Sequence, residues 1–432
     1  MTDAESNLEK AMDCIEHPPH PGIYTSPGRP FAFHMMKLIR EDLPINVEED
    51  KIAVQTVSEN LEPILKEAAF EDNPEDAFYD EFERYIKDLR TRDPDTYEIA
   101  FPLNLQDYQD PPDEFSVRGT VIHRITRDEW ENEYLTPARF EADKLSSFLR
   151  KTPNDPLNDE YTFWKVTTEG RGRRYAMFEA SNLVKLMLAK INYAFRRWYL
   201  RPTSSLPRVQ WSRLESPFFL VAFQDGDFQH FHVSDYDSRR PMSIPWEHMD
   251  VLDVYNSLPE FTGDLSPVDT DIVNSLYEFQ DALTARRQKE SFFCFWRGVE
   301  TLCQTERGQA TEDTLNRAVF AAECQQPREE WNEPFDITAD EIDDMRNDVA
   351  HGSGRVPLSQ HHQEFVKHLF DSLLDLYFEY RGEFGEDEFR YFLEYGGSED
   401  HRVADVESGM QSKRTALDAL QNRSPSSSTG DR

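Results

Sequence analysis

The sequence predicts an α+β N-terminal region followed by an all-α up-down four-helix bundle. Two observations support this fold class. Before about residue 260, short strand-like runs are separated by glycine-containing turns, as in a β-hairpin. After Ser266-Pro267 the apolar residues recur at helical spacing to about residue 381. A chain of 432 residues is also long enough for two or three domains.

Four segments are expected along the chain. Residues 1–30 contain HPPHPG and SPGRP, whose clustered Pro and Gly favour irregular structure. Residues 31–265 should form the α+β region, and 266–397 the helical domain. Residues 398–432 are rich in Ser and charged residues and should form a disordered tail.

Within the α+β region, 49–92 is expected to be mainly helical, because Leu61, Ile64, Leu65 and Ala68 fall on one helical face. A loop rich in Pro and Asp is expected at about 100–114, and a strand at 117–125, where apolar and polar residues partly alternate.

Two hairpins should follow. The first would join 161–167 to 174–178 through Glu169-Gly-Arg-Gly, and the second would join 217–223 to 228–233 through Asp225-Gly226. Both central residues of the second turn tolerate positive φ. An amphipathic helix at 179–200 would lie between the hairpins.

The helical domain should contain four substantial helices and one shorter helix. Thr338 and Glu341 form a capping box that opens the helix ending at His351, and Gly352-Ser-Gly354 should stop it. Several helices with short connections imply a bundle. The expected helices cover 272–283, 292–303, the shorter 311–323, 338–351 and about 359–381.

The net charge of −36 is unusual for a chain that is 38% hydrophobic and 12% aromatic, a content sufficient for a folded core. Such a chain should repel nucleic acid and anionic membranes at ordinary salt. The repulsion weakens in molar salt, where the Debye length falls to about 3 Å. The composition resembles that of haloarchaeal cytoplasmic proteins, and an acidic protein of a mesophile is the alternative.

The four cysteines, Cys14, Cys294, Cys303 and Cys324, form no CxxC pair, which argues against a zinc site or a disulfide framework. No secretory signal and no apolar run of membrane-spanning length is seen. The sequence therefore predicts a cytoplasmic protein without membrane association. No cofactor or metal is predicted either, because nucleotide-binding and metalloprotease motifs are missing.

One motif contains residues that could form a catalytic site, namely Arg346-Asn-Asp-Val-Ala-His351. Its spacing alone means little, because Arg29 and His34 are separated by the same distance in sequence. Five residues apart on a helix, Arg346 and His351 would lie about 140° apart, whereas Asn347 and His351 share a face. Arg346 and His351 could converge on one phosphate only if the helix loosens or two chains face each other.

RNDVAHG, preceded by a helix reading ESFFCFWRGVETLC, resembles the HEPN superfamily and, within it, the Apea-like group. The resemblance covers about 268–395, and Glu300, near the end of the Phe-rich helix, also fits it. It implies a four-helix bundle that often dimerises and commonly acts as a metal-independent RNA endonuclease. Residues 1–265 resemble no family that we can name.

The resemblance implies roles for four residues. His351 would act as general base or acid while the RNA 2′-hydroxyl attacks its own phosphate, leaving a cyclic phosphate. Arg346 would clamp the phosphate, and Asn347 would orient His351 or contact the phosphate. Glu300 would support them.

The predicted function is therefore endoribonuclease activity in defence or stress, with RNA and a second copy of the chain as partners. The alternative is a non-catalytic HEPN module for interaction, dimerisation or nucleotide binding, so enzymatic activity is left open. Arg346 and His351 could also be structural, because cations are favourable at a helix C-terminus and Asp344 or Asp348 could pair with Arg346.

A basic cluster is the second candidate site. Arg171, Arg173 and Arg174, with the arginines at 196–201, could contact RNA or form a solvated hairpin tip and helix end. His230 and His232 share one face of a predicted strand, but two histidines lack the further ligands of a metal site.

Overall fold

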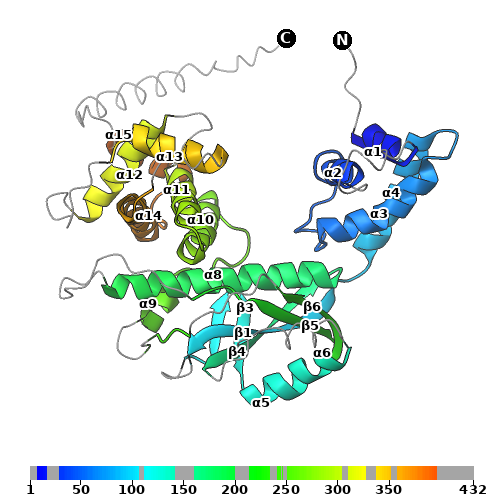
Figure 1. The fold of residues 1–432 in the computed structure, drawn as a ribbon, viewed down its shortest axis with the longest axis horizontal. Helices are drawn as coiled ribbons and strands as arrows, with labels where there is room; N and C mark the ends of the chain where they lie inside the picture. Colours follow the sequence, from blue (N-terminus) through cyan, green and yellow to red (C-terminus); the bar gives the residue numbers. More distant parts are fainter. Residues whose placement is uncertain are drawn as a thin grey trace, which may run out of the picture. The chain divides into compact units, whose positions relative to one another are not determined.

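The computed structural model divides the chain into two compact units, one comprising residues 1–198 and 213–263 and the other 199–212 and 264–432 (Figure 1). The residues described are 7–16, 29–106, 111–141, 160–199, 214–233, 241–244, 246, 251–303, 310–326, 337–351 and 358–396.

The first unit begins with helices that share a hydrophobic core of their own. Leu61, Leu65 and Ala68 are buried in it as the sequence predicts, together with Phe78 and Phe82 from the next helix. Residues 7–16, expected to be irregular, instead form a helix whose apolar side reaches the same core. These elements are α1 (Asn7–Glu16), α2 (Arg29–Lys37), the π-helical turn η1 (Leu38–Asp42), α3 (Val54–Ala68) and α4 (Pro74–Thr91).

A six-stranded antiparallel sheet follows, in the order β2-β3-β4-β1-β5-β6. The central strand β1 corrects one expectation, because residues 100–106 were expected to lie in a loop. Residues 99–105 are buried on both faces of the sheet, so they lack the alternation that marks a half-exposed strand. The strand expected at 117–125 is divided, because Arg118 and Gly119, with φ of 51° and 73°, form a tight turn between β2 and β3. The strands are β1 (Asp95–Gln106), β2 (Glu114–Val117), β3 (Thr120–Ile125), β4 (Tyr161–Gly170), β5 (Phe219–Gln224) and β6 (Asp227–Val233).

The predicted hairpin at Asp225-Gly226 is confirmed, and the other is wrong. Asp225 and Gly226 have φ of 52° and 85°, as a tight primed turn requires, and they join β5 to β6. Residues 174–178, expected to form a strand, belong to α8 (Arg173–Tyr199). Tyr175, Ala176 and Ala180 are buried at helical spacing, so the helix predicted from residue 179 begins six residues earlier.

Helices cover both faces of the sheet (Figure 1). Trp130 of η3 stacks on Phe163 of β4 and meets Phe219 of β5, which places η3 against one face. The hydroxyl of Thr168, whose register puts it on the opposite face of β4, donates to the Ala176 carbonyl of α8. The remaining helical elements are α5 (Arg127–Glu129), η3 (Trp130–Leu135), α6 (Thr136–Glu141) and α9 (Val251–Ser257).

The described part of the second unit is helical throughout, as predicted from the change of period after Pro267. Phe279, Phe295 and Phe370 meet edge to face and fix three helices to one another. The helix predicted to be the shorter one, at 311–323, has 15 residues and is no shorter than the helix on either side of it in the sequence. The final helix was not expected. The helices are α10 (Pro267–Thr284), α11 (Gln288–Leu302), α12 (Thr311–Gln325), α13 (Ala339–His351), α14 (Gln360–Tyr380) and α15 (Glu386–Gly396). The predicted stop at 352–354 and the predicted tail at 398–432 lie outside the described residues.

Candidate functional site

Helix α13 presents Arg346, and its start is fixed by the predicted capping box. The Thr338 backbone N–H donates to Glu341 Oε2 at 2.9 Å, and the Glu341 N–H donates to Thr338 Oγ1 at 3.3 Å. The buried side chains of Ile342 and Met345 anchor the apolar face of the helix. Arg346 lies at the edge of that face, with 33% of its side chain exposed to solvent.

Glu300 of α11 holds one side of the Arg346 guanidinium. Arg346 Nη2 lies 2.7 Å from Glu300 Oε1. The same oxygen accepts a hydrogen bond of 2.8 Å from Nε1 of Trp296, which is fully buried. The structure therefore brings together two of the predicted site residues, Arg346 and Glu300, which are far apart in the sequence.

Two residues that the sequence did not single out hold the other side of the guanidinium. Arg346 Nη1 donates to Thr311 Oγ1 at 3.0 Å and to Asp343 Oδ1 at 3.1 Å. The Thr311 hydroxyl in turn donates to Asp343 Oδ1. Helices α11, α12 and α13 thus meet around one guanidinium.

Some signal for Asp343 was available, because a carboxylate three residues before an arginine on a helix is a common ion-pair partner. From the sequence, Asp344 and Asp348 were expected as the possible ion-pair partners of Arg346. Asp344 is exposed, and the side chain of Asp348 lies outside the described residues. Nothing local could identify Thr311, which opens a different helix.

The rest of the motif is described only in part. Asn347 is exposed on α13. His351 is the last residue of that helix, and its side chain lies outside the described residues. The approach of His351 to Arg346 therefore stays a prediction.

The chemistry that the described site residues can perform is the binding of an anion by Arg346. A guanidinium with in-plane N–H donors is suited to a phosphate, but two carboxylates already bind the Arg346 group. At Nη1 and Nη2, a phosphate would therefore compete with these carboxylates.

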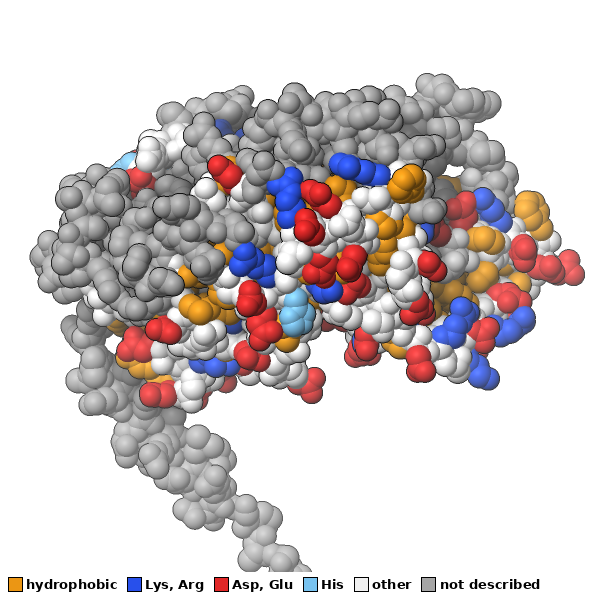
Figure 2. Space-filling model, turned by 90° about the horizontal axis from the view of Figure 1, so that it is seen from below, with side chains coloured by type: hydrophobic (Ala, Val, Ile, Leu, Met, Phe, Trp, Pro, Cys, Tyr) orange, Lys and Arg blue, Asp and Glu red, His pale blue; other side chains and the backbone are white. Residues whose placement is uncertain are grey.

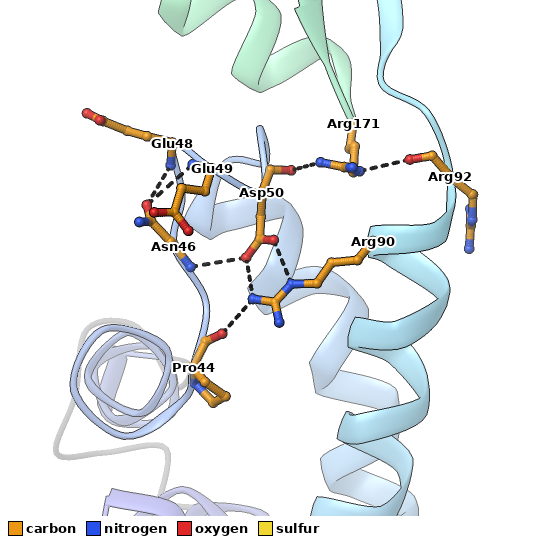
Figure 3. A network of polar contacts seen from close by, with 8 residues as sticks. All are labelled: Pro44, Asn46, Glu48, Glu49, Asp50, Arg90, Arg92 and Arg171. Carbon is orange, nitrogen blue, oxygen red and sulfur yellow. Dashed lines mark hydrogen bonds and ion pairs between the residues drawn. The ribbon is translucent and has the colours of Figure 1, made fainter. Parts of the chain in front are cut away.

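Arg171, a predicted RNA contact, binds the protein's own backbone (Figure 3). Its Nη1 donates to the Asp50 carbonyl at 2.7 Å, and its Nε donates to the Arg92 carbonyl at 3.1 Å. The Asp50 carboxylate is buried and accepts hydrogen bonds from Arg90 at 2.8 and 3.1 Å, which lower the pKa of Asp50. Arg171 thus ties the turn between β4 and α8 to the N-terminal helices.

The two neighbouring arginines also have partners within the chain. Arg173 Nη1 donates to the Gln229 carbonyl of β6 at 3.0 Å, and Arg174 Nη1 lies 2.6 Å from Glu59 Oε2 of α3. The side chains of the arginines at 196–201 lie outside the described residues. The described arginines of the basic cluster therefore all join elements of the first unit.

His230 and His232 lie on β6, near this cluster. Burial lowers the pKa of His230, and the positive charges of Arg173 and Arg174 lower it further. Among the described residues, no group of three or more His, Cys, Asp or Glu side chains is placed to hold a metal ion.

The acidic side chains are widely dispersed. On the face drawn in Figure 2, Asp and Glu lie interspersed with Lys and Arg instead of forming one separate patch. Across the described ranges, no helix has the length and apolar character needed to cross a membrane. In comparisons with known proteins, no family model, no curated protein and no solved structure matches the chain.

Proposed function

We propose that the chain is a metal-independent endoribonuclease built on a HEPN-like four-helix bundle. The observation that supports this proposal is the ion pair between Arg346 of the motif and Glu300 of the Phe-rich helix. The resemblance singled out both residues separately, and a functional site requires such residues to come together.

In this proposal the residues divide the work. Arg346 binds the phosphate that is attacked and stabilises its developing charge. His351 takes or gives a proton, since imidazole titrates near neutral pH. Asn347, one helical turn before His351, orients the imidazole ring. The first unit would select a target or sense a signal in defence or stress.

One observation favours a different function. Arg346 is bonded to side chains of three helices of its own chain, as expected of a residue that holds helices together. The second candidate is therefore a non-catalytic HEPN module for dimerisation, interaction or nucleotide binding, in which Arg346 only supports the bundle.

The two candidates differ in RNA cleavage. Purified protein is incubated with RNA in molar KCl and a chelator, as wild type, as His351→Ala, and as His361→Ala, a matched control outside the motif. The ribonuclease proposal expects products with cyclic-phosphate ends and roughly 100-fold or greater loss of rate in His351→Ala only. Absence of cleavage, or equal cleavage by all three proteins, would contradict it and favour the non-catalytic module.

A further inference from the structure

Two hydrogen-bond donors converge on a single carboxylate oxygen beside Arg346. The Thr311 hydroxyl and Arg346 Nη1 both donate to Asp343 Oδ1. Thr311 is only 6% exposed, so the packing of α12 fixes the direction of its hydroxyl. A hydroxyl and a guanidinium directed at one anionic oxygen are also donors that can bind a phosphate oxygen.

The two carboxylates that bind Arg346 differ in how firmly they are held. Glu300 Oε1 is also bonded to the buried indole of Trp296, which fixes its position. The Asp343 side chain is 50% exposed and lies one helical turn before Arg346. Ion pairs this exposed contribute little to stability, so Asp343 can be replaced at small cost.

We propose that Thr311 and Arg346 form an anion site for a phosphate group, and that Asp343 occupies this site as a built-in competitor. When phosphate binds, it takes the place of the Asp343 carboxylate on Arg346 Nη1 and on the Thr311 hydroxyl. Glu300 stays on Nη2 and keeps the guanidinium in place.

The ligand is a phosphate oxygen, and its source is the phosphodiester backbone of RNA, an identification that rests on the proposed function. Free inorganic phosphate carries the same chemistry. The contact between Thr311 and Asp343 therefore has an autoinhibitory role, because it lowers the affinity of the site for either anion. Thr311 becomes a binding residue that the motif does not contain.

Removal of Asp343 tests the proposal. The full-length chain is prepared as wild type, as Asp343→Ala, and as Asp344→Ala, which removes the same charge from an exposed neighbour on the same helix. Binding of inorganic phosphate is measured by 31P NMR titration. Binding of a fluorescent 2′-O-methyl RNA, which cannot be cleaved, is measured by anisotropy at the same ionic strength.

We expect Asp343→Ala to bind both anions about fivefold more tightly than wild type, because an exposed competing ion pair has been removed. Asp344→Ala should bind both anions as wild type does. Thr311→Val, which keeps the side-chain shape, should abolish the gain when it is combined with Asp343→Ala. Thermal unfolding verifies that this variant is folded, and Thr311→Ser, which retains the hydroxyl, should preserve the gain.

Equal binding by Asp343→Ala and Asp344→Ala would overturn the proposal, because the effect would then be one of net charge. A gain that persists without the Thr311 hydroxyl would overturn it as well. Tighter phosphate binding in Asp343→Ala, together with no RNA cleavage by wild type, would support the anion site while contradicting the ribonuclease function.

Discussion

Replacing Lys190 with Met should stabilise the first unit, by an amount that decreases as the pH rises. Lys190 lies in α8 and is 1% exposed, and its Nζ is 4.3 Å from the centroid of the Tyr255 ring. Burial lowers the pKa of Lys190 from 10.5 to about 8, and the charge of Glu260 acts in the opposite direction.

The magnitude follows from the lowered pKa. A decrease from 10.5 to about 8 corresponds to roughly 3 kcal/mol of lost stability while Lys190 is protonated in both the folded and unfolded states. A cation–π contact with Tyr255 offsets up to about 2 kcal/mol of this loss. The Met variant should therefore gain about 1 to 3 kcal/mol at pH 7.

The sign of the pH dependence is fixed by proton binding. Below the folded pKa of about 8, the full cost of burying the charge is present. Between about 8 and 10.5 Lys190 binds more protons in the unfolded chain than in the folded chain, so the unfavourable contribution of Lys190 to stability decreases as the pH rises. Above 10.5 the cost has disappeared.

Urea unfolding in molar KCl, from pH 7 to pH 10.5, measures the difference between wild type and Lys190→Met. Lys185→Met is the matched control, because Lys185 lies on the same helix and is partly exposed. The Lys190 difference should decrease with pH, because the folded chain loses the Lys190 proton at a lower pH than the unfolded chain does. If Lys190→Met is destabilising at pH 7, or its effect does not vary with pH, the reasoning from burial is refuted.

Two further substitutions test the packing of each unit. Gly298→Ala should destabilise the second unit by about 1 to 3 kcal/mol, because the added methyl group would overlap the Phe370 ring across α11 and α14; a variant with unchanged thermal unfolding would contradict the close approach of these helices. Arg171→Ala should cost about 1 to 3 kcal/mol in urea unfolding, because it leaves two backbone carbonyls without their donor. Loss of RNA binding at unchanged stability would instead identify Arg171 as an RNA contact.

The features predicted correctly from the sequence are those that neighbouring residues determine. The turn at Asp225-Gly226 depends on two residues with positive φ, and the capping box on Thr338 and Glu341. The helical face containing Leu61 depends on spacing along a single helix.

The missed features depend on contacts between distant segments. Strand β1 is central in its sheet, so burial on both faces removes the alternation that would have marked it. The short apolar run at 174–178 fits a strand or a helix equally well, and its length alone could not decide between them.

In the candidate site, too, the contacts between distant segments could not be predicted from the sequence. The resemblance named Glu300 and Arg346 separately, and their ion pair is seen only in the structure. Thr311 precedes Asp343 by 32 residues and reaches it only through the packing of α12 against α13. No periodicity or motif in the sequence indicates that contact. Thr311 was therefore identified as a residue of the site only from the structure.

The net charge of −36 affects the site in two ways, through acidic side chains in direct contact with it and through long-range repulsion. Where carboxylates are so abundant, arginines readily find acidic partners, as Arg174 finds Glu59, so an ion pair at Arg346 does not by itself mark it as structural. Molar salt shortens the Debye length to about 3 Å, which removes the long-range repulsion of a polyanion. It does not remove a carboxylate in direct contact, and Asp343 lies 3.1 Å from Arg346. A phosphate that approaches Arg346 Nη1 in molar salt would therefore still compete with the Asp343 carboxylate.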